Sequence, residues 1–158
     1  MKREYRTFLF FFLISALWPA NFSFGQETRD MIELLRSDIK AQKASIITDA
    51  MQFTEKESNA FWPIYREYEF EAGKIGDARI ALMKEFAKNY EALTNEKAGE
   101  LATKWFDLQA KRVPLLKKYY GKFAKVLSAK RAARFVQVEN QLNLLIDTQV
   151  AESMPLIK

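Results

Sequence analysis

The fold is decided by residues 93–126, which read LTNEKAGELATKWFDLQAKRVPLLKKYYGKFAKV. Apolar side chains recur in this stretch at steps of three and four residues, the spacing of one face of an α-helix. They are Ala98, Leu101, Trp105, Leu108, Leu115, Tyr119, Phe123 and Val126. Pro114 interrupts the pattern without shifting its phase, so it predicts a kinked helix and not the end of one.

The same periodicity continues on both sides of this stretch. It predicts a first helix over about residues 28–52, a second that starts after Thr54 and is kinked at Pro63, and a fourth that starts after Ser128. From about Val150 we expect a frayed tail. No stretch of useful length alternates with period two, and only five Gly and four Pro are present. The sequence therefore predicts an all-α, four-helix protein.

The buried face of each helix is predicted from the same spacing. In the first helix the stripe passes through Gln42, Ile46 and Ala50. In the second it includes Phe61, Tyr65 and Tyr68, and in the fourth Phe135, Val138, Leu142, Leu145 and Ile146. Trp62 and Phe70 point away from the stripe of the second helix. We expect these two aromatic side chains to be exposed and to contact a client protein or a dimer mate.

Three helix starts share one form: an apolar residue, Thr or Ser, two further residues, and a long polar residue. They are Phe53-Thr54-x-x-Glu57, Leu93-Thr94-x-x-Lys97 and Leu127-Ser128-x-x-Arg131. Thr54, Thr94 and Ser128 are the predicted N-caps, since their hydroxyl groups can accept a hydrogen bond from the backbone amide three residues later. Glu57 completes a capping box with Thr54.

The composition excludes most catalytic and metal sites. The 158 residues include no Cys and no His. Catalytic triads, Cys nucleophiles, disulfides and the usual zinc ligand sets are therefore ruled out. No Gly-rich phosphate loop is present either. We expect no enzyme activity, no cofactor, no metal site and no nucleic-acid partner.

The first 25 residues have the form of a secretory signal peptide. Basic residues near the start are followed by an apolar run from Phe8, which is too short for an ordinary transmembrane helix. Small residues at Ser23 and Gly25 place cleavage after Gly25, with Ala20 as a second choice; an uncleaved anchor is the alternative. Residues 26–158 then form one exported, periplasmic domain with a net charge of +3.

Together with export, size and helical content, the three helix starts resemble the LTxxQ motif of the Spy/CpxP family of periplasmic stress proteins. Residues 61–68 and 134–142 are similar to the segments that follow the motif in that family. The resemblance implies an elongated, curved, cradle-like protomer that forms an antiparallel homodimer and binds unfolded clients without ATP. Some relatives dampen a sensor kinase, and others bind metals. Glu57, Lys97 and Arg131 stand where the motif has Gln, and the absence of His and Cys argues against metal binding.

A cationic strip is the most informative charge feature. Residues 111–134 hold nine basic and no acidic residues, whereas residues 54–71 hold five acids and two bases. The basic residues predicted to contact a client are Lys104, Lys111, Lys118, Lys122 and Arg134. The alternative is a solvated face that is partly neutralised by Glu57, Glu67 and Glu71. Contact with an anionic membrane surface is a further, less favoured interpretation.

These observations predict a periplasmic, ATP-independent chaperone or envelope-stress modulator. It would bind unfolded or misfolded proteins through a surface that is both basic and apolar. The alternative is a non-enzymatic regulatory partner of a membrane sensor kinase or of an anti-sigma system. A passive structural protein of the envelope ranks third. The sequence names neither the clients nor the inducing stress.

Overall fold

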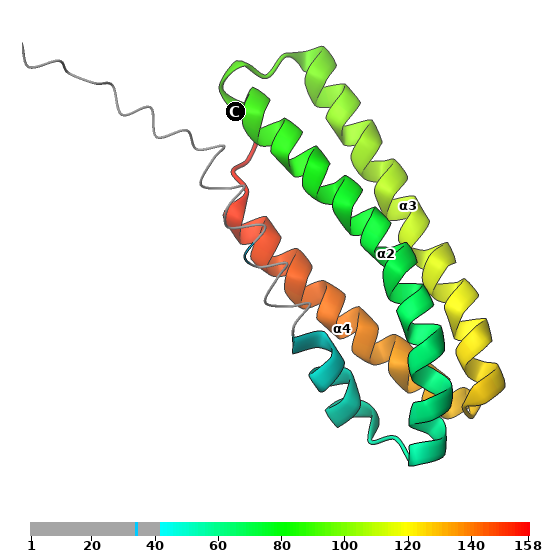
Figure 1. The fold of residues 1–158 in the computed structure, drawn as a ribbon. Helices are drawn as coiled ribbons and strands as arrows, with labels where there is room; N and C mark the ends of the chain where they lie inside the picture. Colours follow the sequence, from blue (N-terminus) through cyan, green and yellow to red (C-terminus); the bar gives the residue numbers. More distant parts are fainter. Residues whose placement is uncertain (1–33, 35–41) are drawn as a thin grey trace, which may run out of the picture.

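The computed structural model describes residue 34 and residues 42–158, and these are helical nearly throughout (Figure 1). Residues 42–51 form a helical segment, here called helix 42–51. It is followed by α2 (Glu55–Asn89), the 3-10 turn η1 (Tyr90–Ala92), α3 (Asn95–Val126) and α4 (Ala129–Ser153). The described ranges contain no strand, so the all-α prediction is confirmed for them. The predicted signal peptide and most of the predicted first helix lie outside the described residues.

The helices form a long hairpin with a shorter arm beside it. Helices α2 and α3 run antiparallel and contact each other along much of their length, with η1 in their connection (Figure 1). At the opposite end the chain turns into α4, which runs back beside α2. Helix 42–51 lies near the end where α3 turns into α4, and it enters α2 through residues 52–54.

The three predicted N-caps are present. The Thr54 hydroxyl accepts from the amide of Glu57 at 3.3 Å, and the Glu57 carboxylate accepts from the amide of Thr54 at 3.0 Å, which completes the capping box. Thr94 accepts from the amide of Lys97 at 3.2 Å. Ser128 accepts from the amide of Arg131 at 3.3 Å. Each cap satisfies an amide that the first turn of its helix leaves without an intrahelical partner.

The long polar residues of two helix starts also contact each other. The Arg131 Nε atom lies 2.6 Å from Glu57 Oε1, so the start of α4 is joined to the start of α2. The pKa of Glu57 lies below its usual range, chiefly because of the hydrogen bond from the Thr54 backbone, with a further contribution from Arg131. A complementary Glu–Arg pair therefore occupies two positions at which the LTxxQ motif has Gln.

The core is aromatic and lies where α2, α3 and α4 converge. The ring of Phe61 is stacked 4.8 Å from that of Phe123 and lies 5.1 Å from that of Phe135, while Phe123 and Phe135 are 4.6 Å apart. All three side chains are completely buried. Such ring pairs stabilise a fold beyond the area they bury. One residue from each long helix thus ties the three helices together at this end.

Several predicted buried positions are wrong. In helix 42–51 the buried apolar residues are Ile47 and Met51, one position after the predicted stripe, and Ile46 is 38% exposed. Two neighbouring isoleucines made the phase of this helix ambiguous, and packing into the core cluster shared by the long helices decides it. Trp105 is also exposed, as are Val126 and Leu145. The periodicity of one helix does not show how much of its length is covered by a neighbouring helix.

The tail prediction is also wrong. Helix α4 continues to Ser153, beyond the predicted end near Val150. The residues after it contact the hairpin: the Tyr90 hydroxyl donates to the Leu156 carbonyl at 3.2 Å, and Lys158 pairs with Glu91 at 2.8 Å. These contacts hold the segment against η1.

The two prolines lie inside continuous helices, Pro63 in α2 and Pro114 in α3. The kink expected at each of them stays a prediction, as does the curved cradle shape. Across the described residues, no helix combines the length and apolar character needed to cross a membrane.

The capping box gives a first testable prediction. Thr54→Ala removes the hydroxyl that accepts from the Glu57 amide, so we expect the free energy of unfolding to fall by about 1 kcal/mol. Urea unfolding followed by circular dichroism measures the change. Thr103→Ala is the matched control, because the hydrogen bond described for the Thr103 hydroxyl lies within α3, to the Gly99 carbonyl, at an exposed position. It should change stability by less than about 0.5 kcal/mol. Equal losses in both variants would contradict the role of the cap.

Candidate functional site: the α2–α3 groove

An open groove runs between α2 and α3. It consists of two adjoining hollows of about 570 and 330 Å³, and Lys111 borders both of them. The first hollow is lined by Phe70, Glu71, Lys74, Ile75, Lys111, Pro114, Leu115 and Lys118. The second is lined by Ala78, Ala81, Leu82, Glu85, Lys104, Asp107, Leu108 and Lys111. The groove therefore combines an apolar floor with charged side chains.

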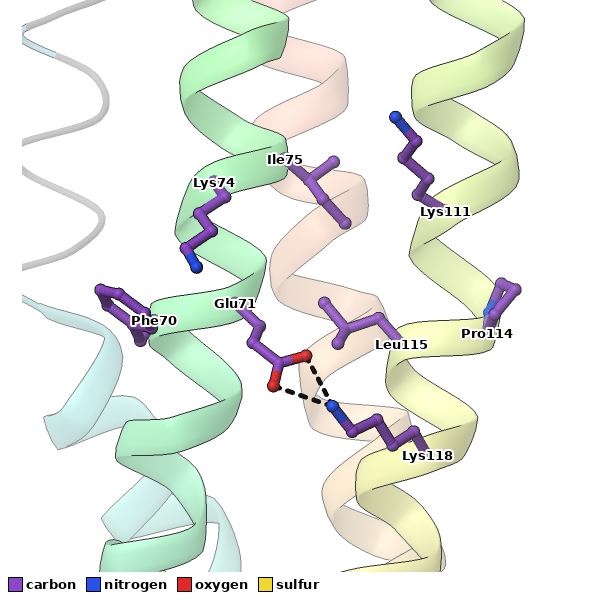
Figure 2. Close-up of a pocket in the computed structure, with 8 residues that line it drawn as sticks. All are labelled: Phe70, Glu71, Lys74, Ile75, Lys111, Pro114, Leu115 and Lys118. Atoms are coloured by element: carbon purple, nitrogen blue, oxygen red, sulfur yellow. Dashed lines mark hydrogen bonds and ion pairs between the residues drawn. The ribbon is translucent and has the colours of Figure 1, made fainter.

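Figure 2 shows how the side chains of the first hollow are arranged. Ile75 of α2 and Leu115 of α3 lie between the two helices and form the apolar floor. Glu71 and Lys118 meet below them, and Lys111 extends from α3 above them. Phe70 and Lys74 lie on the outer side of α2, where the Lys74 ammonium is 4.4 Å from the centre of the Phe70 ring.

Several lysines of the predicted strip pair with acids of α2. Lys118 contacts both carboxylate oxygens of Glu71 at 2.8 Å. This contact, together with a hydrogen bond from Tyr119, holds the pKa of Glu71 below its usual range. Lys122 pairs with Glu67 at 2.5 Å. The structure therefore supports the alternative interpretation in part, because Glu71 and Glu67 neutralise two of the predicted contact residues.

Lys104 is paired at the other end of the groove. It lies 3.0 Å from Glu85 and 2.5 Å from Glu100, which precedes it by one helical turn. Hydrogen bonds from Lys104 and Lys97 lower the pKa of Glu100 to about 2. The reciprocal contacts with Glu100 and Glu85 raise the pKa of Lys104. Lys104 is thus held in a network of charges and is only partly available to a ligand.

Two cations of the groove remain without a carboxylate partner among the described residues. Lys111 is exposed and forms none of the described ion pairs, although it borders both hollows. Lys74 is exposed as well, and its described side-chain contact is with the Phe70 ring. Asp107, one helical turn before Lys111, is an exposed acid of the second hollow that forms none of the described ion pairs. The cations without a described carboxylate partner are therefore Lys111, which borders both hollows, and Lys74, which borders the first.

The structure brings four of the seven predicted contact residues together. Phe70, Lys104, Lys111 and Lys118 line the groove. Lys122 pairs with α2 beyond the first hollow. The other two residues, Trp62 and Arg134, are not part of this site.

The structure places Trp62 and Arg134 outside the groove, and their contact with a client stays a prediction. Trp62 is only partly exposed; it packs against the aromatic core, and its indole nitrogen donates to Ser58 at 3.0 Å. Arg134 donates to the Ala50 carbonyl at 2.8 Å and so contacts the end of helix 42–51. Helix 42–51 and residues 52–54 lie close to both side chains. The apolar stripe of a single helix gives no information on such contacts with another segment.

Sequence reasoning also missed residues that shape the site. Lys74, Ile75 and Leu115 line the groove. The signal for Lys74 was its position one turn after Phe70, which brings the two side chains together on the helix surface. Glu139 was missed entirely: it is 1% exposed and accepts a hydrogen bond from Tyr68 at 2.8 Å. A buried acid in an otherwise regular stripe cannot be recognised before its partners on other helices are known.

Within the described ranges, no group of three or more Asp and Glu side chains is arranged to hold a metal ion. Comparison with known proteins adds no relative: no family model, no curated protein and no solved structure matches the chain. The groove and its charges are therefore the basis for a functional proposal.

Asp147 of α4 joins the long helices beside the groove. Its carboxylate accepts from Arg79 of α2 and, at 3.0 Å, from Arg112 of α3. Burial by itself would raise the pKa of Asp147, but the hydrogen bonds from the two arginines outweigh it, so the pKa lies below its usual value. The pKa values of Glu71, Glu85 and Glu100 are lowered as well, by their lysine partners.

These shifts predict how stability depends on pH. A carboxylate whose pKa is lower in the folded state stabilises the fold above its unfolded pKa, and this contribution is lost as the pH falls through the folded value. We expect the free energy of unfolding to decline between about pH 5 and pH 2. The decline should be shallower in Asp147→Asn, because one of the shifted groups is then absent. Urea unfolding at a series of pH values measures both slopes, and parallel curves for the two proteins would contradict the assignment of Asp147.

Proposed function

We propose that this protein is a periplasmic, ATP-independent chaperone or envelope-stress modulator that binds unfolded or misfolded proteins in the α2–α3 groove. The observation that carries the proposal is the position of Lys111, an exposed cation without a carboxylate partner among the described residues, between two hollows with apolar floors. Unfolded chains present apolar side chains together with charges, which is the chemistry that this groove complements. No covalent step and no cofactor belong to the proposed function.

Binding in such a groove is expected to be weak and reversible. The floor is formed by small and medium-sized apolar residues, among them Ala78, Ala81, Ile75 and Leu115, so a client segment buries little area at any one point. Lys111 and Lys74 add long-range attraction for acidic segments, which increases the rate of encounter more than the affinity. A protein that must release its client without ATP needs contacts of this kind.

The direct test is suppression of aggregation of a denatured client by the purified chain from Gln26. A several-fold molar excess of this protein should reduce light scattering. Lys111→Glu should weaken the protection about fivefold, because it reverses the charge at the middle of the groove. Lys125→Glu is the matched control: Lys125 is also exposed and on α3, and forms none of the described ion pairs, but it does not line the groove. Absence of protection by the unmodified chain would contradict the proposal.

The alternative proposal is a regulatory partner of a membrane sensor kinase or an anti-sigma system, which would use the same groove on an acidic sensor domain. Capture from envelope extracts distinguishes the two proposals. A broad set of captured proteins, reduced by Lys111→Glu, favours the chaperone, whereas one dominant partner favours the regulator. Capture of no protein would favour a passive structural role.

We further propose that the protein forms an antiparallel homodimer through the outer face of α3. This face exposes Phe106 and Val113, which are 64% and 73% exposed, one on each side of Ala110. A Cβ atom added at Gly99 or Gly121 would have no neighbour within 4 Å, so neither glycine is required by packing within the chain. An antiparallel copy would place the acids of α3, which all lie in its first half, opposite the lysines of its second half.

The dimer proposal predicts that Phe106→Asp weakens self-association by at least about tenfold, because the charge would be buried at the centre of the interface. Sedimentation equilibrium measures the dissociation constant. Phe70→Asp makes the same change at an equally exposed phenylalanine, 68% exposed, that lies on α2, and it should leave self-association unchanged. A chain that stays monomeric at high concentration would exclude the dimer.

A further inference from the structure

A second binding surface lies beneath helix 42–51, on the side of α2 and α4 that this helix covers. Helix 42–51 buries two apolar side chains there, Ile47 at 0% exposed and Met51 at 1%. They join the core cluster that includes Phe61, Tyr65 and Phe135. The covered face therefore has an aromatic floor supplied by two long helices.

A carboxylate stands near the start of this helix. Glu139 of α4 is 1% exposed and accepts from the Lys43 ammonium at 2.9 Å and from the Tyr68 hydroxyl at 2.8 Å. The Lys43 ammonium also lies 5.7 Å from the centre of the Tyr65 ring and 5.8 Å from that of Tyr68. Lys43 is the cation that pairs with Glu139 among the described residues. A helix that occupies this face must bring a cation to this point, because a buried carboxylate without one is strongly disfavoured.

Two arginines stand at the other end of the same face. Arg134 donates to the carbonyl of Ala50 at 2.8 Å. Arg131 donates to the carbonyls of Met51 at 2.8 Å and Gln52 at 3.1 Å. The last carbonyls of a helix have no intrahelical partner and carry the negative end of the helix dipole. Arg131 and Arg134 therefore bind the backbone at the end of a helix, whatever side chains that helix carries there.

These features together form a receptor for an amphipathic helix. The carboxylate selects a lysine, the aromatic floor accepts apolar side chains four and eight residues later, and the arginines hold the C-terminal carbonyls. Lys43, Ile47 and Met51 have this spacing. Binding of an amphipathic helix through anchors on one of its faces is a common mode of peptide recognition.

The connection of helix 42–51 to α2 is non-helical. It consists of residues 52–54, in which Gln52 has φ of 46°, in the left-handed region that glycine favours. The buried ion pair of helix 42–51 contributes little net stability, because both charges lose their hydration. Glu139 Oε2 is also buried without a hydrogen-bond partner in the described part of the chain. The three long helices, by contrast, are joined directly to one another by the stacked core and by Asp147.

We infer that the face beneath helix 42–51 is a docking site for an amphipathic helix of a partner protein, and that helix 42–51 is its releasable occupant within the chain. The partner helix carries a lysine followed by apolar residues at the fourth and eighth positions after it. This docking site is separate from the α2–α3 groove, so the inference does not rest on the proposed function.

Binding of a labelled peptide tests the inference. The probe is fluorescein-labelled QKASIITDAMQ, the sequence of residues 42–52, and fluorescence anisotropy measures its affinity for the full chain. Ile47→Asp should release helix 42–51 and leave the docking site vacant, so this variant should bind the probe at least about tenfold more tightly than the unmodified protein. Leu145→Asp introduces the same charge at an exposed leucine of α4 and should bind as the unmodified protein does. A probe with Lys43→Glu should lose its affinity for Ile47→Asp. Equal binding of the natural probe by all three proteins would overturn the inference.

A second measurement applies even if Ile47→Asp fails to fold. Because the chain has no cysteine, one introduced thiol reports opening at one position. The thiol of Ile47→Cys should react with a maleimide at least about tenfold faster than that of Leu101→Cys, a buried position of the α2–α3 hairpin. Adding unlabelled probe should increase the rate of Ile47→Cys further. Equal reaction rates at the two positions, or no effect of the probe, would show that helix 42–51 does not exchange with a helix from outside.

Discussion

Three phenylalanine rings, one from each long helix, hold this fold together. Phe61, Phe123 and Phe135 are in contact where α2, α3 and α4 converge, and all three are fully buried. The helices are 35, 32 and 25 residues long, so most of their length lies beyond this contact. Farther along, ion pairs contribute much of the link between helices, as at Glu85 and Asp147. One end of the molecule is therefore held mainly by aromatic packing, whereas the other combines buried apolar residues, among them Leu82 and Leu101, with ion pairs that salt can screen.

This division explains why two different binding surfaces are proposed. The α2–α3 groove lies along the part of the hairpin where charged side chains line shallow apolar hollows, which suits weak and varied ligands. The face beneath helix 42–51 lies at the aromatic end, where a deeper floor and fixed charges at both ends suit one kind of ligand. The two proposals thus assign a general surface and a selective surface to the same chain.

The sequence predicted local structure better than contacts between helices. Helix type and the three N-caps follow from residues close together in the chain, so Thr54, Thr94 and Ser128 could be assigned before the structure was known. Burial was harder, since the choice between Ile46 and Ile47 depends on where the long helices place the core cluster.

Charge pairing was harder still. Nine basic residues without an acid predicted an open cationic strip, yet Glu67 and Glu71 of α2 neutralise part of it because the hairpin brings them opposite Lys122 and Lys118. Lys43 and Glu139 are even farther apart in the sequence, so their contact could not be predicted from either local pattern. Of the proposed client site, Phe70 and Lys111 were predicted correctly as exposed, and what the structure added is that they border one groove.

The ion pair formed by Glu57 and Arg131 also restricts which substitutions this sequence can accept during evolution. Each of these side chains neutralises the charge of the other. A substitution of one of them would therefore leave the other charge unpaired where the two helix starts meet, even if the same substitution were harmless on an isolated helix. Homologous chains should therefore vary at these two sites in concert, as Glu with Arg, as two glutamines, or with the charges exchanged. An alignment that treats every helix start as independent of the others would miss this covariation.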